Sequence, residues 1–179
     1  MISYETERCH TAVREGYRSI LQTDSELRLP IERERICEFY RRMRAACVHW
    51  AERAEGERLR ERYLALEDHG ERARFRTAQY RLLCEPVWEG YPYLSYLCRS
   101  SFGTDGSEIQ RVMAQVWQVE EQTLLPMRQI LQIFPATTSK KRLPFRPDGV
   151  YVLERELVFY RNADGETSVP LEFRLERKS

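Results

Sequence analysis

Three patterns follow one another in residues 109–131, whose sequence is IQRVMAQVWQVEEQTLLPMRQIL. The first part, up to Val119, is an apolar run typical of a strand. Glu120 to Thr123 are polar and predict a turn, and the spacing of apolar residues from Leu124 to Leu131 predicts a short helix. These residues form no catalytic pattern, so the segment indicates a scaffold and leaves the activity open.

A long amphipathic helix is predicted upstream of this segment. Its apolar stripe, with spacings of three and four residues, consists of Ile36, Tyr40, Met43, Cys47, Trp50 and Ala54. The helix is expected over residues 31–67, with Gly56 as the position of a kink or break and Asp68-His69-Gly70 as the stop signal. Trp50 is expected to lie between the helix and a sheet, where truncation to alanine costs on the order of 3 to 5 kcal/mol.

Strands are predicted on both sides of this helix. Weak alternation over residues 2–29 predicts two strands joined by a turn at Glu15-Gly16. After the helix the period becomes strand-like, and turns that contain glycine or proline separate three further strands. These strands form an expected antiparallel meander at residues 72–84, 91–102 and 108–119.

The C-terminal part shows the clearest strand pattern. Apolar and polar residues alternate over residues 168–175, which predicts a half-buried strand, and Pro170 favours an edge position. This strand is expected to pair with residues 157–161 across a glycine-bearing hairpin loop. The expected element order is β-β-α-β-β-β-short α-β-β. The sequence thus predicts a single α+β domain, residues 1–179, in which one long amphipathic helix packs on an antiparallel sheet.

The composition restricts the partners of the chain. Its 29 basic and 28 acidic residues give a net charge of +1, which supplies no long-range field, so we expect no nucleic acid partner. The longest apolar stretches fall far short of the roughly 20 residues that span a bilayer, so we expect no membrane segment. Acids stand at the N-terminus where a signal peptide needs a basic region, which favours a cytoplasmic chain with its five cysteines reduced.

No pattern in the sequence indicates a catalytic residue, a cofactor or a metal site. The chain contains no nucleophile elbow, no dinucleotide-binding fingerprint and no P-loop. Its three histidines do not have the spacing of metal ligands. An enzyme of unknown class is the third alternative for function, and it requires a pocket that gathers His10, His49 or His69 with a glutamate and a cysteine.

Aromatic side chains support the second alternative, a small-ligand or glycan-binding module. Rings on a sheet surface can stack on sugars or bases. The candidate ligand-binding residues are Tyr91, Tyr93, Tyr96, Trp88 and Trp117. A basic loop nearby in the sequence contains Lys140, Lys141, Arg142 and Arg146. Tyrosines in strands also serve as core residues, so this alternative requires that the rings form a concave, exposed surface.

A series of strand and turn motifs begins near Tyr91. The pieces are Tyr93–Ser101, Gly103–Gly106, Val112–Val119, Glu120–Thr123, Leu124–Leu131, Phe145–Tyr151 and Leu157–Tyr160. In this order they resemble the domain of unknown function 3298 (DUF3298), which occurs in the anti-sigma factor RsiV and the deacetylase PdaC. The turn at Gly103–Gly106 departs from the glycine-glycine-alanine-histidine-like turn of that family. The resemblance implies an α+β fold with an accessory or sensing role, and it transfers no catalytic residue.

The leading hypothesis for function is a non-catalytic, intracellular α+β domain that acts through contacts with a protein partner. It rests on the lack of a catalytic pattern and on the resemblance to the family. The sequence predicts neither the identity of the partner nor the oligomeric state.

Overall fold

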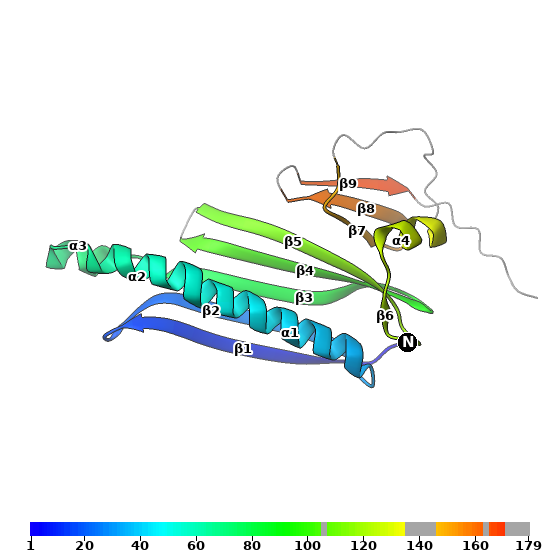
Figure 1. Ribbon diagram of the computed structural model, residues 1–179, viewed down its shortest axis with the longest axis horizontal. Helices are drawn as coiled ribbons and strands as arrows, with labels where there is room; N and C mark the ends of the chain where they lie inside the picture. Colours follow the sequence, from blue (N-terminus) through cyan, green and yellow to red (C-terminus); the bar gives the residue numbers. More distant parts are fainter. Residues whose placement is uncertain (105–106, 135–145, 163–164, 171–179) are drawn as a thin grey trace, which may run out of the picture. The chain divides into compact units, whose positions relative to one another are not determined.

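The chain forms an α+β fold, as its sequence predicts (Figure 1). The computed structural model describes residues 1–104, 107–134, 146–162 and 165–170. Its elements, in chain order, are β1 Tyr4–Glu15, β2 Arg18–Pro30, α1 Glu34–Trp50, the π-helical turn η1 Ala51–Glu55, α2 Gly56–Leu64, α3 His69–Arg74, β3 Ala78–Gly90, β4 Tyr93–Thr104, β5 Ser107–Gln118, β6 Thr123–Leu124, α4 Met127–Ile133, β7 Gly149–Val152, β8 Glu156–Arg161 and β9 Gly165–Pro170.

The first six strands form one mixed sheet in the order β1-β2-β3-β4-β5-β6. β1 and β2 are antiparallel, whereas β2 and β3 are parallel, with a register that runs from Leu21 opposite Ala78 to Leu27 opposite Cys84. The prediction of a wholly antiparallel sheet is therefore wrong. Parallel neighbours need a crossover connection, and the long helix between β2 and β3 is that crossover.

The last three strands form a separate antiparallel sheet, β7-β8-β9. The predicted hairpin is present, since Leu157 of β8 lies opposite Val169 of β9, while residues 171–175 of the predicted strand lie outside the described residues. The expected element order omits β7. All residues of β7 are buried, so its sequence does not have the alternation that marks a half-buried strand.

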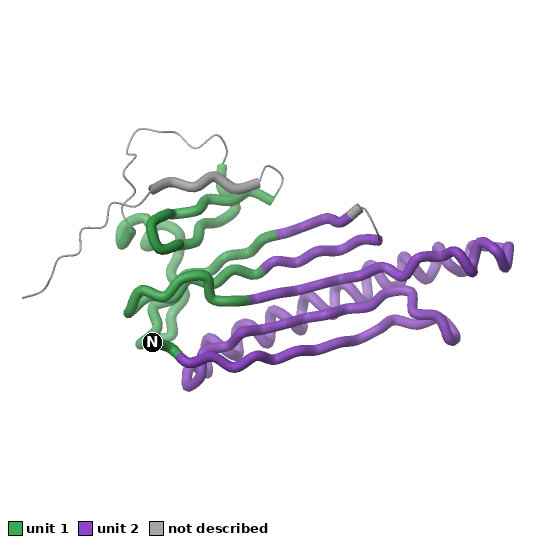
Figure 2. The backbone as a smooth tube through the Cα atoms, turned by 180° about the vertical axis from the view of Figure 1, so that it is seen from behind, with its two compact units in different colours: residues 1–2, 85–98, 112–179 green, residues 3–84, 99–111 purple. Residues whose placement is uncertain are grey.

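The chain divides into two compact units that share three strands (Figure 2). The helical unit contains residues 3–84 and 99–111, and the two-sheet unit contains residues 1–2, 85–98 and 112–179. β3, β4 and β5 each contribute one part to either unit, so the units are not consecutive segments joined by a linker. The single domain over residues 1–179 stays a prediction.

The core of the helical unit lies between the long helix and strands β2 and β3, which the helix crosses in Figure 1. The helix is continuous from Glu34 to Leu64, because the residues at the junctions of α1, η1 and α2 keep helical backbone angles. It is shorter at each end than the predicted span of residues 31–67. Its buried side chains and those of the strands are Ile36, Tyr40, Ala51, Leu59, Leu21, Leu27, Leu29, Tyr80 and Leu82.

The π-helical turn at Ala51–Glu55 changes which sequence positions of the helix face the sheet. A π turn holds one residue more than an α turn, so the buried face moves by about one position beyond it. Leu59 is buried, whereas Ala54 is exposed and Trp50 is 44% exposed. The expected place of Trp50 between helix and sheet is met only in part, because its ring contacts Tyr80 of β3 but stays 44% exposed. Its ring meets the Tyr80 ring from the side, with 6.3 Å between the ring centroids.

Asp68 begins a helix, whereas the sequence Asp68-His69-Gly70 predicts a stop signal. Its side chain accepts a hydrogen bond from the backbone N–H of Gly70 and thereby caps α3. The preceding helix ends at Leu64, and the strand predicted from residue 72 begins at Ala78. A short capped helix therefore separates the crossover helix from β3.

The core of the two-sheet unit lies between β7 and β8, parts of β4 and β5, and α4. The described part of residues 109–131 follows its predicted pattern here, with a strand up to Gln118 and a helix over Met127–Ile133. The buried residues of the larger cluster are Val116, Ile130, Phe134, Val150, Val152, Leu157 and Phe159.

Two hydrogen bonds join the second sheet to the strands beneath it within this unit. The backbone N–H of Val152 donates to Ser95 Oγ at 3.0 Å, and the backbone N–H of Ala114 donates to the Tyr160 hydroxyl at 2.9 Å. The first of these bonds is buried, so its loss leaves a buried amide without a partner.

Leu59 tests the helix register beyond the π turn. Its side chain is 4% exposed, whereas Leu64 on the same helix is 48% exposed. Leu59→Ala is expected to lower the free energy of unfolding by about 2–5 kcal/mol, since it leaves a cavity in the core. Leu64→Ala is expected to change it by less than about 0.5 kcal/mol. Chemical denaturation measures both values, and equal losses would contradict the register.

Tyr160 tests the junction of the second sheet with β5. Tyr160→Phe removes the oxygen that accepts the Ala114 N–H, so we expect the free energy of unfolding to fall by about 1–3 kcal/mol. Tyr17→Phe is the control, because the Tyr17 side chain is fully exposed. Thermal denaturation of both variants gives the comparison, and an unchanged midpoint for Tyr160→Phe would show that the bond is not needed.

Candidate functional site

Two of the candidate aromatic residues are buried. Tyr96 is fully buried and Trp117 is 4% exposed. β4 is buried continuously from Leu94 to Cys98, so the alternation of side chains leaves no open face at Tyr96. In this conformation neither ring is available to stack on a ligand.

The other candidate aromatic residues do not form one surface. Trp88 and Tyr93 each meet the Phe134 ring edge to face, at centroid distances of 5.6 Å and 5.3 Å. Tyr91 is 73% exposed, and its hydroxyl donates a hydrogen bond to the Glu120 carboxylate. Ligand binding by these residues stays a prediction, but the rings are not arranged as the concave surface that it requires.

The three histidines are exposed and lie on different elements. His10 of β1 has its Nδ1 atom 2.7 Å from the Asp24 carboxylate of β2, while His49 lies on α1 and His69 on α3. Within the described ranges, no three histidine, cysteine, aspartate or glutamate side chains gather so that they could hold a metal ion. The described residues therefore do not form the histidine-centred pocket that the enzyme alternative requires.

Cys47 of α1 and Tyr80 of β3 form a hydrogen-bonded pair in the core of the helical unit. Burial raises the pKa of the Tyr80 phenol well above its usual range. Burial also raises the pKa of the Cys47 thiol, and the hydrogen bond with Tyr80 opposes that rise only in part. Both groups stay protonated near neutral pH, so neither provides a nucleophile.

No helix in the described part of the chain is both long enough and apolar enough to cross a membrane. Within the predicted basic loop, Arg146 is exposed, and the lysines and the remaining arginine lie outside the described residues.

A groove of about 330 Å³ opens in the helical unit, where α2 adjoins the ends of β3, β4 and β5. The lining residues that define its character are Arg58, Leu59, Arg62, Ala78, Phe102, Glu108 and Ile109. Leu59 and Ala78 are buried and form an apolar floor, while both arginines are exposed. The groove therefore combines an apolar base with guanidinium groups at its rim.

Ile109 and Arg111 share one face of β5 with Gln115, because every second side chain of a strand points the same way. The Cys98 thiol of β4 donates a hydrogen bond to Gln115 at 3.8 Å, which places Cys98 on that same face. Ile109 is 65% exposed. A large apolar side chain is thus left open next to the groove.

The shared face of β4 and β5 is the one on which the helix packs. Ser100 and Phe102 follow Cys98 at every second position of β4 and therefore lie on the same face. Ser100 hydrogen-bonds Tyr80 of β3, and the Tyr80 ring meets Trp50 of α1. Phe102 is half-buried at the groove because the helix lies over β2 and β3 (Figure 1).

In the C-terminal half of β5, backbone N–H and C=O groups on the outer edge have hydrogen-bond partners. The backbone N–H of Val112 donates to Asn162 Oδ1 at 2.6 Å, and the Asn162 amide donates back to the Val112 carbonyl. The N–H of Ala114 donates to the Tyr160 hydroxyl. Residues with even numbers therefore turn their backbone N–H and C=O groups away from β4.

The same edge is open at the start of the strand. Since the N–H and C=O of every second residue point to one side, Glu108 and Gln110 direct these groups outward as well. β6, the outer neighbour of β5, pairs only with Trp117 and Gln118. Among the described residues no strand pairs with Glu108 and Gln110 on that side. The site thus consists of an open strand edge beside a groove.

No motif in the sequence predicts a site at this groove. The helix and the start of β5 are far apart in the sequence, and the crossover brings them together. One available signal was the spacing of Arg58 and Arg62, which places both on one side of a helix. Another was Ile109, an apolar residue between Glu108 and Gln110 at the beginning of a predicted strand.

The structure defines a class of protein: an α+β domain with a mixed six-stranded sheet and a second, three-stranded sheet. This fold is similar to that of a DUF3298 family protein from Pseudomonas aeruginosa PAO1, with a TM-score of 0.56 and 8% sequence identity over 96% of this chain and 90% of that chain. A DUF3298 family member from Bacteroides fragilis NCTC 9343 gives a TM-score of 0.50 and 9% identity over 94% of this chain and 90% of that chain.

At these identities the likeness concerns the fold alone. The chain has a DUF3298-like fold, in agreement with the resemblance of its sequence motifs. No family model and no curated protein matches the sequence. The closer resemblance to RsiV and PdaC stays a prediction.

Ion pairs hold the other flank of the helix to β1. The Glu7 carboxylate lies 2.8 Å from Arg41 and 2.9 Å from Arg44 of α1, and Arg60 of α2 lies 2.5 Å from Glu15. The hydrogen bond from the Arg41 guanidinium lowers the pKa of the Glu7 carboxyl below its usual value of 4.5, against the effect of burial. These contacts are structural, because no groove-lining residue takes part in them.

The lowered pKa of Glu7 predicts a pH dependence of stability. A carboxyl with a lower pKa in the folded state contributes stability that is complete above its unfolded pKa and is lost as the pH falls through the folded value. The difference in unfolding free energy between the wild type and Glu7→Gln is therefore expected to shrink from about pH 6 to about pH 3. Denaturation at several pH values measures it. Glu26→Gln, which removes a more exposed pair with Arg8, is the control.

Proposed function

We propose that the chain is a non-catalytic protein-interaction module, with a sensing or accessory role, that binds an extended segment of a protein partner. The observation that carries the proposal is the open edge of β5 at Glu108 and Gln110, beside the apolar groove. Outward N–H and C=O groups of an edge strand are a template for another strand, and an adjoining pocket supplies selectivity for side chains.

The two edges of the large sheet differ in a way that supports this proposal. Charged side chains protect strand edges against unwanted pairing, and β1 carries exposed Arg8, His10 and Arg14. The open part of β5 also exposes Glu108 and Arg111, but it adds an apolar residue, Ile109, which is 65% exposed. An exposed apolar residue on an open edge is suited to contact with a partner.

The non-catalytic part of the proposal rests on the titratable groups. The thiol of Cys47 and the phenol of Tyr80 stay protonated, and the histidines lie exposed on separate elements. The small-ligand or glycan alternative has less support, because Tyr96 and Trp117 are buried.

Affinity capture from the source cells tests the proposal. Wild-type chain is expected to enrich a protein in stoichiometric amount, and Ile109→Asp to reduce its recovery about tenfold, because the carboxylate opposes apolar contact at the edge. Ile31→Asp is the matched control, since Ile31 is 46% exposed in the turn between β2 and α1. Equal recovery with both variants, or no enriched protein, contradicts the proposal.

A further inference from the structure

We infer, on the basis of the proposed function, that the partner segment has the pattern acidic-x-apolar and adds to β5 as an antiparallel strand. The apolar side chain lies opposite Ile109, and the carboxylate lies opposite Arg111. The ligand of this site is thus an extended segment of a partner protein with an acidic residue two positions before an apolar one.

The backbone of β5 sets the register of the added strand. Glu108 and Gln110 each direct one N–H and one C=O outward, so each can exchange two hydrogen bonds with the residue opposite in an antiparallel strand. Ile109, between them, then occupies a position without such bonds, where opposing side chains come closest. The partner residue opposite Ile109 therefore makes the main side-chain contact.

The exposed Ile109 side chain favours an apolar side chain at that position. Directly opposed residues of two antiparallel strands point to the same face of the sheet. The residue opposite Ile109 is therefore directed to the face on which Phe102, Leu59 and Ala78 line the groove. Contact with Ile109 removes apolar surface of both chains from water.

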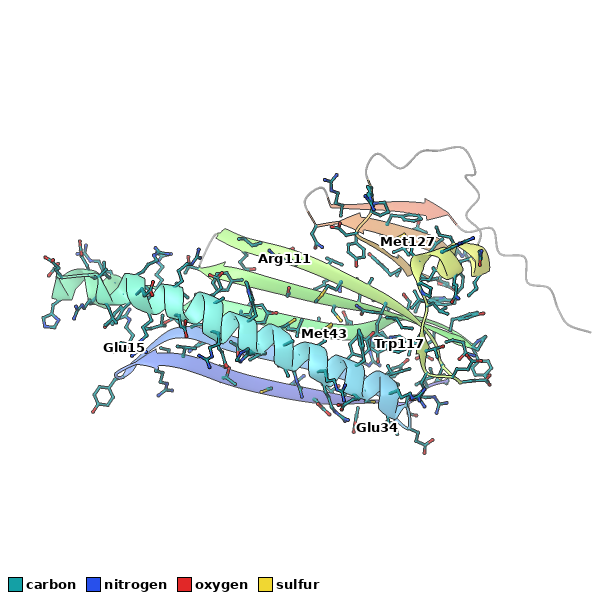
Figure 3. The ribbon with its side chains drawn as sticks, viewed as in Figure 1. Glu15, Glu34, Met43, Arg111, Trp117 and Met127 are labelled. Atoms are coloured by element: carbon teal, nitrogen blue, oxygen red, sulfur yellow. The ribbon has the colours of Figure 1, made fainter. Side chains whose placement is uncertain are left out.

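The charges around the groove favour an acidic residue at the second position. Arg111 lies on the same face as Ile109, two residues further along β5, and Figure 3 labels it on that strand. Neither Arg111 nor Arg62 of α2 has an ion-pair partner among the described residues, whereas Arg58 lies 2.9 Å from Glu55. Among the residues that line the groove, Glu108 is acidic, and its side chain alternates with that of Arg111 along β5. A carboxylate opposite Arg111 therefore meets an arginine that has no ion-pair partner among the described residues.

The same charges disfavour a second copy of this chain as the occupant. Antiparallel pairing of two β5 edges about Ile109 places Glu108 opposite Gln110 and Arg111 opposite Ser107. Arg111 then has no carboxylate opposite it. A partner segment with an acidic residue supplies the charge that self-pairing does not.

Fluorescence anisotropy with a synthetic peptide tests the inference. The probe is fluorescein-labelled Ser-Thr-Glu-Thr-Val-Thr-Ser, titrated with the full chain. Lysine in place of its glutamate is expected to weaken binding at least about tenfold, because an opposed pair of unlike charges is replaced by like charges. Arg111→Glu is expected to reverse this preference, so that the lysine peptide binds more tightly than the glutamate peptide.

Two controls show whether the edge and the charge act as inferred. Arg53→Glu changes an exposed arginine that pairs with Glu57 and does not line the groove, so it is expected to keep the preference for glutamate. Proline in place of the threonine between glutamate and valine removes a donor to Gln110 and is expected to abolish binding. Circular dichroism shows whether each variant is folded.

The outcomes separate this inference from the proposed function. Equal affinity for the glutamate and lysine peptides, with binding still lost on proline substitution, overturns the acidic pattern and leaves the interaction module in place. A second outcome is that no peptide binds while capture of a partner still depends on Ile109. This outcome also overturns the acidic pattern and leaves the interaction module in place. Failure of both experiments removes both proposals. A dimer of the free chain that Ile109→Asp abolishes assigns the edge to a second copy and also overturns the inference.

Discussion

The parallel pairing of β2 with β3 is the constraint on which the helical unit depends. Parallel neighbours require a connection that returns to the starting end of the sheet, and here that connection is the long helix. Such a helix stays on the sheet only if it buries an apolar stripe, which Ile36, Tyr40, Ala51 and Leu59 provide. The π turn keeps the stripe facing the strands over the whole length of the helix, because it moves the buried face to Leu59.

A single helix cannot cover a sheet of this width, and the candidate site follows from that mismatch. A helix with its side chains is about 10–12 Å wide, whereas strands lie about 4.8 Å apart, so one helix covers two or three strands. Ion pairs such as Glu7 with Arg41 hold the helix flank toward β1. The face of β4 and β5 next to α2 is left without a covering helix, and its groove exposes Ile109 and half-buries Phe102.

The fold supports the architecture of this protein, and the site supports its proposed function. The DUF3298-like fold is shared with proteins of 8% and 9% sequence identity, and a shared fold by itself does not determine a function. The open edge at Glu108 and Gln110 and the charge of Arg111 belong to the side chains and backbone of this particular chain. The proposal of a protein partner therefore rests on the site, and the likeness to solved structures supports the architecture.

Local periodicity in the sequence determined the α+β class, the long helix, the hairpin at residues 157–161 and the strand-turn-helix order of residues 109–131, because each depends only on nearby residues. Only the tertiary structure decided the parallel pairing, the second sheet and the burial of Tyr96, since these depend on which elements meet. The groove, too, was decided only by the tertiary structure. Arg62 and Ile109 are distant in the sequence, and local spacing does not encode that the crossover helix brings them to one place.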